Sequence, residues 1–209
     1  MKILLVDDHM LVRQGLKQIL ADEYPKAIFG EASTATEALQ FVHAKKWDLV
    51  LLDLTMPGRG GLDVLSELKA VQPGLPILVL SMHPEAEFAV RVLKGGASGY
   101  LTKQSAADEM LTAVKKVLAG GRYITAALAE KLATDVALGT SRLPHEELSN
   151  REFQTMRLLA AGKSVKEIGE ALNLSGKTVS TYRARVLEKL QLKSTVDLAR
   201  YALEHGLVE

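Results

Sequence analysis

The sequence predicts an α/β domain, built on a five-stranded parallel sheet in a doubly wound arrangement, followed by a small all-α domain. Two observations lead to this fold class. Over residues 1–121, five short apolar segments bounded by polar or turn residues alternate with segments of helical periodicity. Over residues 148–209, the recognisable patterns are helical. Strands that alternate with helices form a parallel sheet covered by helices on both faces.

The predicted strands are short runs of apolar residues. They span residues 4–6, 27–31, 49–52, 77–80 and 100–102. The run at 27–31 is the weakest of the five. Short apolar runs that end at polar or turn residues indicate buried strands.

The predicted helices follow these strands in turn. Helical patterns cover residues 11–20, a segment that opens at Thr34, and residues 62–71, 84–94 and 105–118. Thr34 is followed three residues later by Glu37, a capping-box pattern that marks the N-terminus of a helix. The pair Gly120-Gly121 ends the fifth helix.

The chain divides into three predicted parts. Residues 1–121 form the α/β domain and residues 148–209 the helical domain. Residues 122–147 interrupt the alternation and are predicted to be a linker that is partly helical. Residues 126–136 could form one helix, whereas "GTSRLPHEE" combines turn formers and charge with few apolar side chains, as linkers do.

Polar residues stand where four of the predicted strands end. Asp7 and Asp8 follow the first strand, Asp53 the third, Ser81 the fourth and Lys103 the fifth. Ligand sites of parallel sheets lie beyond the carboxyl ends of the strands, so we expect these side chains to converge. Three carboxylates, a hydroxyl and an ammonium group suit a divalent cation together with a phosphoryl group.

Each of these residues also has an ordinary interpretation. Asp7 and Asp8 could cap the first helix, and Asp53 could be a turn residue at a strand end. Ser81 and Lys103, taken singly, are more often ordinary than functional. The set is harder to explain in this way, because three carboxylates without a cation would repel one another and raise their own pKa values. The cluster therefore argues for a bound metal.

Charge is distributed unevenly along the chain. Residues 1–122 contain fourteen basic and fourteen acidic residues, whereas residues 176–193 contain five basic residues and one acid, a local net charge of +4. Local positive potential favours contact with nucleic acid. A solvated helix face would have the same composition, so charge alone leaves both interpretations open.

The basic segment lies within a recognisable arrangement of helices. A short helix is predicted over residues 165–172, a turn over "NLS", a longer helix over 176–190 and a last helix over 195–205. A short helix, a tight turn and a longer basic helix match the helix-turn-helix arrangement, whose second helix enters the major groove of DNA.

Composition excludes several classes of function. The chain contains no cysteine, which rules out disulfides, thiolate metal sites and a cysteine nucleophile. The start "MKILLVDD" has an apolar run too short for a signal-peptide core, and no run approaches the roughly 18 residues of a membrane span. We therefore expect a cytoplasmic protein without a membrane segment.

The motifs resemble those of two-component response regulators of the NarL/FixJ type, in which a receiver domain precedes a LuxR-type helix-turn-helix domain. Four receiver-like motifs are "LLVDDH", "DLVLLDLTMPG", "LVLSMH" and "GYLTK". The C-terminal motif is "LSNREFQTMRLLAAGKSVKEIGEALNLSGKTVSTYRARVLEKLQLKS". Five motifs in the right order and spacing cover nearly the whole chain. The resemblance implies a flavodoxin-like receiver over residues 1–121 and a LuxR-type DNA-binding domain over 148–209.

This resemblance implies a phosphorylation site that binds Mg²⁺. Asp8 and Asp53 would be direct ligands, Asp7 a ligand through water, and the Thr55 backbone carbonyl a further ligand. Asp53 would also be the phosphoacceptor, forming an acyl phosphate. The preference of Mg²⁺ for oxygen ligands agrees with this donor set.

The same resemblance gives roles to three further residues. Lys103 would supply a cation to the phosphoryl group, and Ser81 would donate a hydrogen bond to its oxygens. On phosphorylation the Ser81 hydroxyl would move inward and Tyr100 would follow it, although Tyr100 could also be an ordinary half-buried aromatic residue. With a sensor histidine kinase as phosphodonor, this would switch DNA binding, so we expect a transcription regulator and not an enzyme.

The second helix of the helix-turn-helix is expected to contact promoter DNA. By position, Ser180, Thr181 and Ala184 would meet base edges, and Arg185 could read guanine. Those predicted to point outward or to contact phosphates are Lys177, Thr178, Tyr182, Arg183 and Lys189. Simple solvent exposure is the alternative for each. The resemblance also implies that the last helix supplies a homodimer contact on DNA.

The sequence leaves three alternative functions open. A phosphatase of the haloacid dehalogenase class also uses a strand-end aspartate with magnesium, but its D-x-D motif would need an acid where this chain has Thr55. A regulator gated by a small ligand would share the LuxR-type domain but lack the strand-end residues. A receiver that regulates without phosphorylation would have the same fold. Only an experiment would distinguish it from a phosphorylated regulator.

Overall fold

The computed structural model describes residues 1–56, 61–82, 85–105, 107–138 and 143–208. These residues form two compact units, one that ends at residue 138 and one that begins at residue 143. No helix in the described ranges combines the length and apolar character needed to cross a membrane. The linker predicted over 122–147 stays a prediction, and its residues 139–142 lie outside the described ranges.

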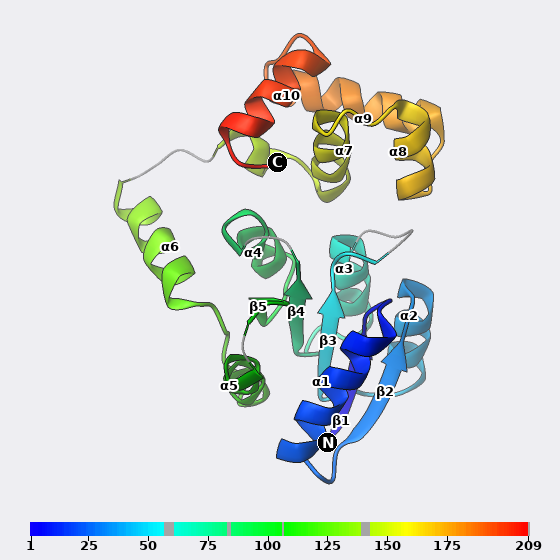
Figure 1. Cartoon of the computed structure of the whole chain (residues 1–209), viewed down its shortest axis with the longest axis vertical. Coiled ribbons are helices and arrows are strands. Elements are labelled where there is room, and N and C mark those ends of the chain that lie inside the picture. The colour runs from blue at the N-terminus through cyan, green and yellow to red at the C-terminus, as the bar shows by residue number, and fades with distance from the viewer. Residues whose placement is uncertain (57–60, 83–84, 106, 139–142, 209) are drawn as a thin grey trace. The chain divides into compact units, whose positions relative to one another are not determined.

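The first unit contains a five-stranded parallel sheet (Figure 1). Its strands are β1 Lys2–Val6, β2 Ile28–Ala32, β3 Leu49–Asp53, β4 Ile77–Ser81 and β5 Gly99–Thr102. The strand order is β2-β1-β3-β4-β5, and every neighbouring pair is parallel. This order confirms the predicted doubly wound, flavodoxin-like fold. The order reverses between β1 and β3, which is where ligands bind in sheets of this kind.

Helices cover both faces of the sheet (Figure 1). The helices are α1 Met10–Glu23, α2 Ala35–Ala44, α3 Gly61–Val71, α4 Glu85–Lys94 and α5 Ala107–Leu118. Helices α1 and α5 lie on one face, and α2, α3 and α4 on the other. Pro84, the predicted start of the fourth helix, lies outside the described residues.

Helix α2 begins as the sequence predicts, with one difference in its cap. The Thr34 hydroxyl accepts a hydrogen bond from the backbone N–H of Glu37 at 3.2 Å. The Glu37 carboxylate reaches one residue further back than a capping box requires, and accepts hydrogen bonds from the backbone and hydroxyl of Ser33. These bonds lower the pKa of Glu37.

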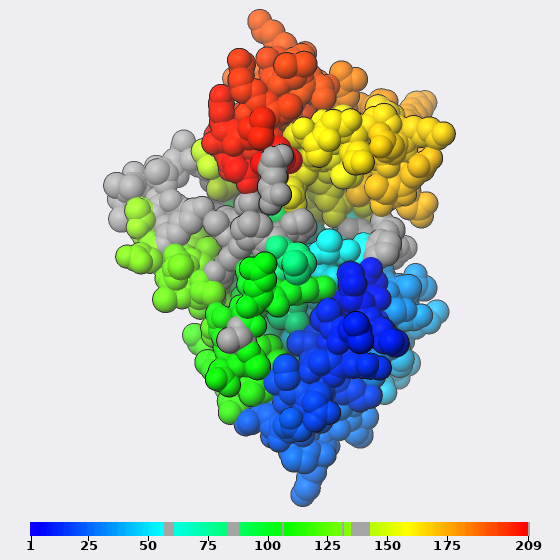
Figure 2. All heavy atoms as spheres, viewed as in Figure 1, coloured from blue at the N-terminus to red at the C-terminus, as the bar shows by residue number. Residues whose placement is uncertain are grey.

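Alternation along the strands sends side chains into two apolar layers. In one layer, the strand residues Ile3, Leu5, Leu51 and Leu80 cluster with Met110 and Val114 of α5. Figure 2 shows α1 and α5 side by side on this face of the unit. The intervening strand residues, such as Leu4 and Val50, are equally buried and face the other helical layer. Burial on both faces explains why the strands are almost continuously apolar.

The chain returns to the sheet after α5. Tyr123 pairs with Gly99 of the edge strand β5 in an isolated parallel bridge. A Cβ at Gly99 would lie 2.8 Å from the Tyr123 carbonyl oxygen, so glycine permits this close approach. Helix α6 Ala126–Leu138 and the short 3₁₀ helix η1 Pro144–Glu147 follow. The start of the predicted linker is thus hydrogen-bonded to β5, which the sequence did not indicate.

Within residues 143–208, the second unit consists mainly of four α-helices (Figure 1). They are α7 Asn150–Ala160, α8 Val165–Leu172, α9 Gly176–Lys189 and α10 Thr195–Glu204. Each begins with a serine cap, whose hydroxyl accepts a hydrogen bond from a backbone N–H three residues on. The buried core includes Phe153, Met156, Ile168, Val179, Val186 and Leu198.

The turn between α8 and α9 is tight. Asn173 ends α8 in the left-handed conformation, with φ of 54°, which asparagine adopts more readily than most residues. A Cβ at Gly169 would lie 2.7 Å from the Leu174 carbonyl oxygen, so only glycine fits where the turn folds back on the helix. The predicted helix-turn-helix arrangement is confirmed, with "NLS" as its turn.

Candidate functional site

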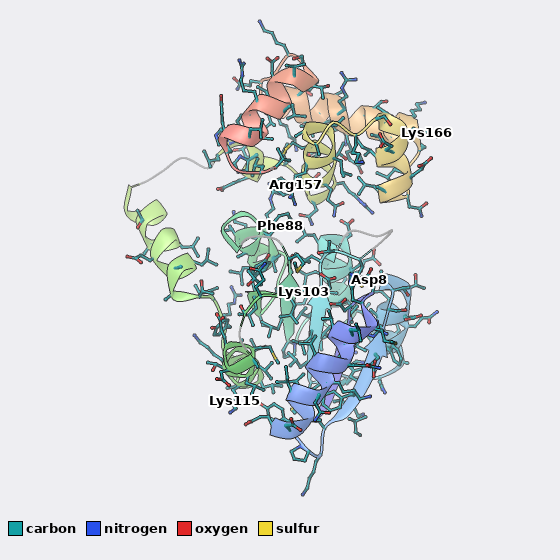
Figure 3. The ribbon with its side chains drawn as sticks, viewed as in Figure 1. Asp8, Phe88, Lys103, Lys115, Arg157 and Lys166 are labelled. Atoms are coloured by element: carbon teal, nitrogen blue, oxygen red, sulfur yellow. The ribbon has the colours of Figure 1, made fainter. Side chains whose placement is uncertain are left out.

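The predicted acidic residues come together at the carboxyl edge of the sheet. Asp7 and Asp8 follow β1, and Asp53 ends the neighbouring strand β3. One oxygen from each carboxylate and a ring nitrogen of His9 lie within 4.8 Å of one another. Figure 3 shows Asp8 and Lys103 at this same edge. The parallel topology therefore produces the convergence predicted from the strand ends.

Lys103 bridges two of these carboxylates. Its Nζ lies 2.8 Å from Asp53 Oδ2 and 2.6 Å from Asp7 Oδ2, and its side chain is 10% exposed. Burial by itself lowers the pKa of Lys103, but the hydrogen bonds and negative charges of Asp53 and Asp7 outweigh burial and raise it above the ordinary value. The ammonium group therefore stays charged at neutral pH and neutralises part of the acidic cluster formed by Asp7, Asp8 and Asp53.

Both oxygens of Asp53 are oriented by neighbours. Oδ2 accepts the hydrogen bond from Lys103, and Oδ1 accepts one of 2.9 Å from the backbone N–H of Thr55. The side chain of Asp53 is fully buried. A fixed, buried carboxylate paired with a cation can act as a nucleophile toward phosphorus, because phosphoryl transfer depends mainly on positioning and charge stabilisation.

The donor set fits a hard divalent cation. Asp8 Oδ1 is buried and accepts no hydrogen bond, although His9 Nδ1 lies 2.9 Å away. An oxygen in this position, close to oxygens of Asp7 and Asp53, suits an ion such as Mg²⁺, which is bound by one or two carboxylates. The part assigned to the Thr55 carbonyl stays a prediction.

Two residues near this site were missed at the level of sequence. The backbone N–H of His9 donates to Asp7 Oδ1 at 2.8 Å, and its ring Nδ1 lies 3.2 Å from the same atom. Arg13 Nη1 donates to the backbone carbonyl of Asp7 at 2.7 Å. His9 could have been found because it follows the acidic pair directly, whereas the contact of Arg13 depends on how α1 packs.

The two residues predicted to transmit a switch lie on the neighbouring strands. Ser81 is the last residue of β4, beside β3, and is fully buried; its backbone carbonyl accepts from the backbone N–H of Lys103 at 2.8 Å. Tyr100 lies in β5 and is also fully buried. Tyr100 is therefore a core residue in this structure, more deeply buried than the half-buried alternative allowed.

Helix α9 has one buried and one exposed face. Val179 and Val186 are buried, as is Leu190 at the C-terminal end of the helix, whereas Leu187, predicted to face inward with them, is half-buried. Of the residues predicted to meet DNA, Thr178 and Tyr182 are half-buried, and the exposed ones are Lys177, Ser180, Thr181, Arg183, Ala184, Arg185 and Lys189. The exposure predicted for Lys177, Ser180, Thr181, Ala184 and Arg185 agrees with the structure. Contact of any α9 residue with DNA stays a prediction.

The hydroxyl groups on the outer face of α9 are bonded to their own helix. Ser180 Oγ donates to the Gly176 carbonyl at 2.9 Å, and Thr181 Oγ1 donates to the Lys177 carbonyl at 3.0 Å. Such bonds to the preceding turn are common for helical serine and threonine. They leave the oxygen lone pairs as the groups that Ser180 and Thr181 present outward.

Lys189 is held inside its unit. Its Nζ lies 2.7 Å from Glu152 Oε2, and Glu152 Oε2 also accepts from the backbone N–H of Ser149. Burial raises the pKa of Glu152, but the bonds from Lys189 and Ser149 outweigh it and the net effect is a lowered pKa. Lys189 therefore has a structural partner that the sequence did not reveal, beside its predicted role at DNA phosphates.

Comparison with known families matches both units. Residues 3–115 match the family described as "Response regulator receiver domain". Residues 146–202 match the family described as "Bacterial regulatory proteins, luxR family".

Relatives match this chain along nearly their whole length. The response regulator GacA of Pseudomonas aeruginosa is 39% identical over 209 residues, covering 100% of this chain and 98% of that protein. The response regulator UvrY of Escherichia coli K12 is 38% identical over 206 residues, covering 98% of this chain and 94% of that protein. RcsB of Salmonella enterica serovar Typhimurium, solved bound to the promoter P1flhDC with the phosphomimetic BeF₃⁻, has a TM-score of 0.69 and 26% identity, covering 96% of this chain and 97% of that chain.

Proposed function

Because the chain belongs to the response regulators, with a receiver domain and a luxR-family DNA-binding domain, we propose that its phosphorylation-dependent control of transcription begins with phosphoryl transfer to Asp53. The observation that carries this proposal is the buried Lys103 ammonium group, which lies within hydrogen-bond distance of both Asp53 and Asp7. No other described lysine pairs with two carboxylates of the acidic cluster.

The proposed reaction moves a phosphoryl group from a histidine side chain of a sensor kinase to Asp53. A carboxylate oxygen of Asp53 attacks phosphorus and forms an O–P bond. The P–N bond to the donor imidazole breaks, and its electron pair leaves with the nitrogen. Lys103 offsets the negative charge on the phosphoryl oxygens, and Thr55 N–H holds the carboxylate in place.

The acidic cluster would hold Mg²⁺. We assign Asp8 and Asp53 as direct ligands, Asp7 as a ligand through water and the Thr55 carbonyl as a further ligand. A bound Mg²⁺ supplies positive charge that stabilises the transferring phosphoryl group. Support comes from the buried oxygen of Asp8, which accepts no hydrogen bond although His9 Nδ1 lies 2.9 Å away, and from the oxygens that the three carboxylates offer.

The proposed switch passes from Ser81 to Tyr100. An acyl phosphate at Asp53 places new acceptor oxygens at the end of β3, and the Ser81 hydroxyl at the end of adjacent β4 would turn to donate to them. Tyr100 lies in β5, directly beside β4 in the sheet. A shift of the Ser81 side chain would change the space that the Tyr100 ring occupies, because buried rings fit their surroundings closely.

The output is binding of promoter DNA by helix α9 in a homodimer. The exposed basic residues of α9 support the DNA contact. Val196 and Leu203 of α10 support the dimer contact, since these apolar side chains are 79% and 59% exposed and lie seven residues apart, on one side of the helix. We place phosphorylation and DNA binding in the cytoplasm, where a bacterial promoter is accessible.

The first test identifies the phosphorylated residue. Full-length protein incubated with acetyl phosphate and Mg²⁺ should gain one phosphoryl group by intact-mass measurement, and Asp53→Asn should gain none. Asp63→Asn is the control, because it removes a carboxylate of α3 outside the acidic cluster. Equal labelling of wild type and Asp53→Asn would reject the assignment.

A further inference from the structure

The peptide bond that joins Asp7 to Asp8 is held by a residue outside the acidic cluster. Arg13 lies near the start of α1, and its Nη1 donates to the Asp7 carbonyl at 2.7 Å. Strand β1 ends at Val6, so this carbonyl lies beyond the last residue of the strand. Because a peptide unit is planar, fixing its oxygen also fixes the Cα atoms that carry both carboxylates.

Arg13 is itself held by strand β2. Its Nε is buried and makes an ion pair of 3.5 Å with Glu31 Oε2 without a hydrogen bond, whereas Lys17 Nζ donates to Glu31 Oε1 at 2.8 Å. The hydrogen bond from Lys17, with a smaller contribution from Arg13, lowers the pKa of Glu31, so the carboxylate remains ionised. The Arg13 side chain is only 13% exposed. The guanidinium group therefore connects β2, α1 and the end of β1.

We propose that Arg13 is a positioning residue of the phosphorylation site, which holds Asp7 and Asp8 in the arrangement that binds a divalent cation. This inference rests on the function proposed for the acidic cluster. The carboxylate of Asp8 depends on its backbone for its position, because its buried Oδ1 accepts no hydrogen bond and its ion-pair neighbour, His9 Nδ1 at 2.9 Å, belongs to the next residue in the chain. Its position follows from the backbone to which it is attached.

The direction in which replacement of Arg13 changes metal affinity distinguishes a positioning role from an effect of charge. Arg13 is a cation, so by charge alone it repels a metal ion, and its removal would tighten metal binding. A positioning role predicts the opposite, because loss of the bond to the Asp7 carbonyl lets the two carboxylates move apart. Residues that orient metal ligands typically contribute about 10–100-fold to metal affinity.

The test measures binding of Mn²⁺ to full-length protein by the electron paramagnetic resonance signal of free Mn²⁺, without any phosphodonor. Arg13→Gln should raise the Kd for Mn²⁺ about tenfold. Arg13→Lys keeps the charge but loses the planar fork that spans the Asp7 carbonyl and Glu31, and should raise the Kd as well. Lys17→Gln is the control, because it removes a cation bound to the same Glu31 and should leave the Kd within about twofold.

A second measurement distinguishes a local effect on the metal site from a general loss of folding. At saturating Mg²⁺, Arg13→Gln should regain the wild-type rate of labelling by acetyl phosphate, because Asp53 and Lys103 are intact. An unchanged or lower Kd in Arg13→Gln would overturn the proposal, and so would a rate that Mg²⁺ fails to restore. If Arg13→Gln does not fold, Arg13→Lys decides by the same criteria. Failure of the wild type to bind Mn²⁺ would contradict the function proposed for the cluster, and the inference with it.

Discussion

Glu152 and Lys189 form an ion pair that joins the first turn of α7 to the last turn of α9. Lys189 Nζ lies 2.7 Å from Glu152 Oε2, with the Glu152 side chain 4% exposed and that of Lys189 41% exposed. Glu152 also completes the capping box of α7 with Ser149. The C-terminal end of α9 is thus fixed by a buried carboxylate.

Loss of the cation should destabilise the helical unit. Lys189→Met leaves Glu152 buried without its partner, and we expect the free energy of unfolding to fall by about 2 kcal/mol, less than the 3–5 kcal/mol of a fully buried pair because Lys189 is partly exposed. Urea unfolding of the full chain, followed on the helical unit, measures this. Lys163→Met, which removes an exposed pair with Glu167, should cause no comparable loss.

This pair also predicts a pH dependence. The pKa of Glu152 is lowered in the folded state, so its contribution is fully present above its ordinary value of 4.5 and is lost as pH falls through the folded-state value. The stability difference between wild type and Lys189→Met should therefore shrink below about pH 4.5. A difference that stays constant from neutral to acidic pH would show that Lys189 contributes by packing alone.

Lys103 and a divalent cation should partly substitute for each other in stability. Lys103→Gln leaves Asp7 and Asp53 buried side by side without a cation, and we expect a loss of about 1–3 kcal/mol in metal-free buffer. Saturating Mg²⁺ should recover much of this loss, since the metal supplies the missing charge. Urea unfolding with and without Mg²⁺ tests this. Lys115→Gln, which removes an exposed pair with Glu23, should behave as wild type, and a loss independent of Mg²⁺ would contradict the account.

Two arginines of α9 should affect DNA binding in different ways. Arg183→Ala should weaken binding to all sequences alike and reduce the salt-dependence slope by about 1. Arg185→Ala should instead relax the preference at one base position, at a cost of about 1–3 kcal/mol for the preferred site. Sites selected from random DNA, followed by salt titrations, measure both effects. If neither variant changes DNA binding, α9 is only a solvated basic face.

The helical unit alone should bind DNA without a phosphodonor. We expect the segment 143–209, which has its own apolar core, to bind more tightly than unphosphorylated full-length protein. If only about 1% of the unphosphorylated full-length protein is in a state that can bind DNA, its apparent affinity for DNA falls about a hundredfold. Equal affinity of the two proteins, on the same DNA and at the same salt, would instead favour activation by receiver dimerisation.

The strand-end residues show what sequence can predict. The pair Asp7-Asp8 is far in the chain from Asp53 and from Lys103, yet a parallel sheet brings the ends of its strands to one edge whatever the details of packing. Their convergence therefore followed from strand–helix alternation alone. The helix-turn-helix followed in the same way from local periodicity and turn residues.

The missed contacts depend on how helices pack on their neighbours. Arg13 meets Glu31 and the Asp7 carbonyl only because α1 lies against the ends of β1 and β2. Lys189 meets Glu152 across 37 residues of chain. In sequence, each of these side chains is indistinguishable from a surface charge, because no local pattern records the partner.

The most direct test of the account is whether Asp53 controls DNA affinity. Full-length wild type and Asp53→Asn are titrated onto one selected DNA site at constant salt, each with and without acetyl phosphate in the presence of Mg²⁺. We expect acetyl phosphate to lower the Kd of the wild type for DNA and to leave the Kd of Asp53→Asn unchanged. An equal change in both proteins, or no change in a wild type shown by mass to be phosphorylated, would contradict it.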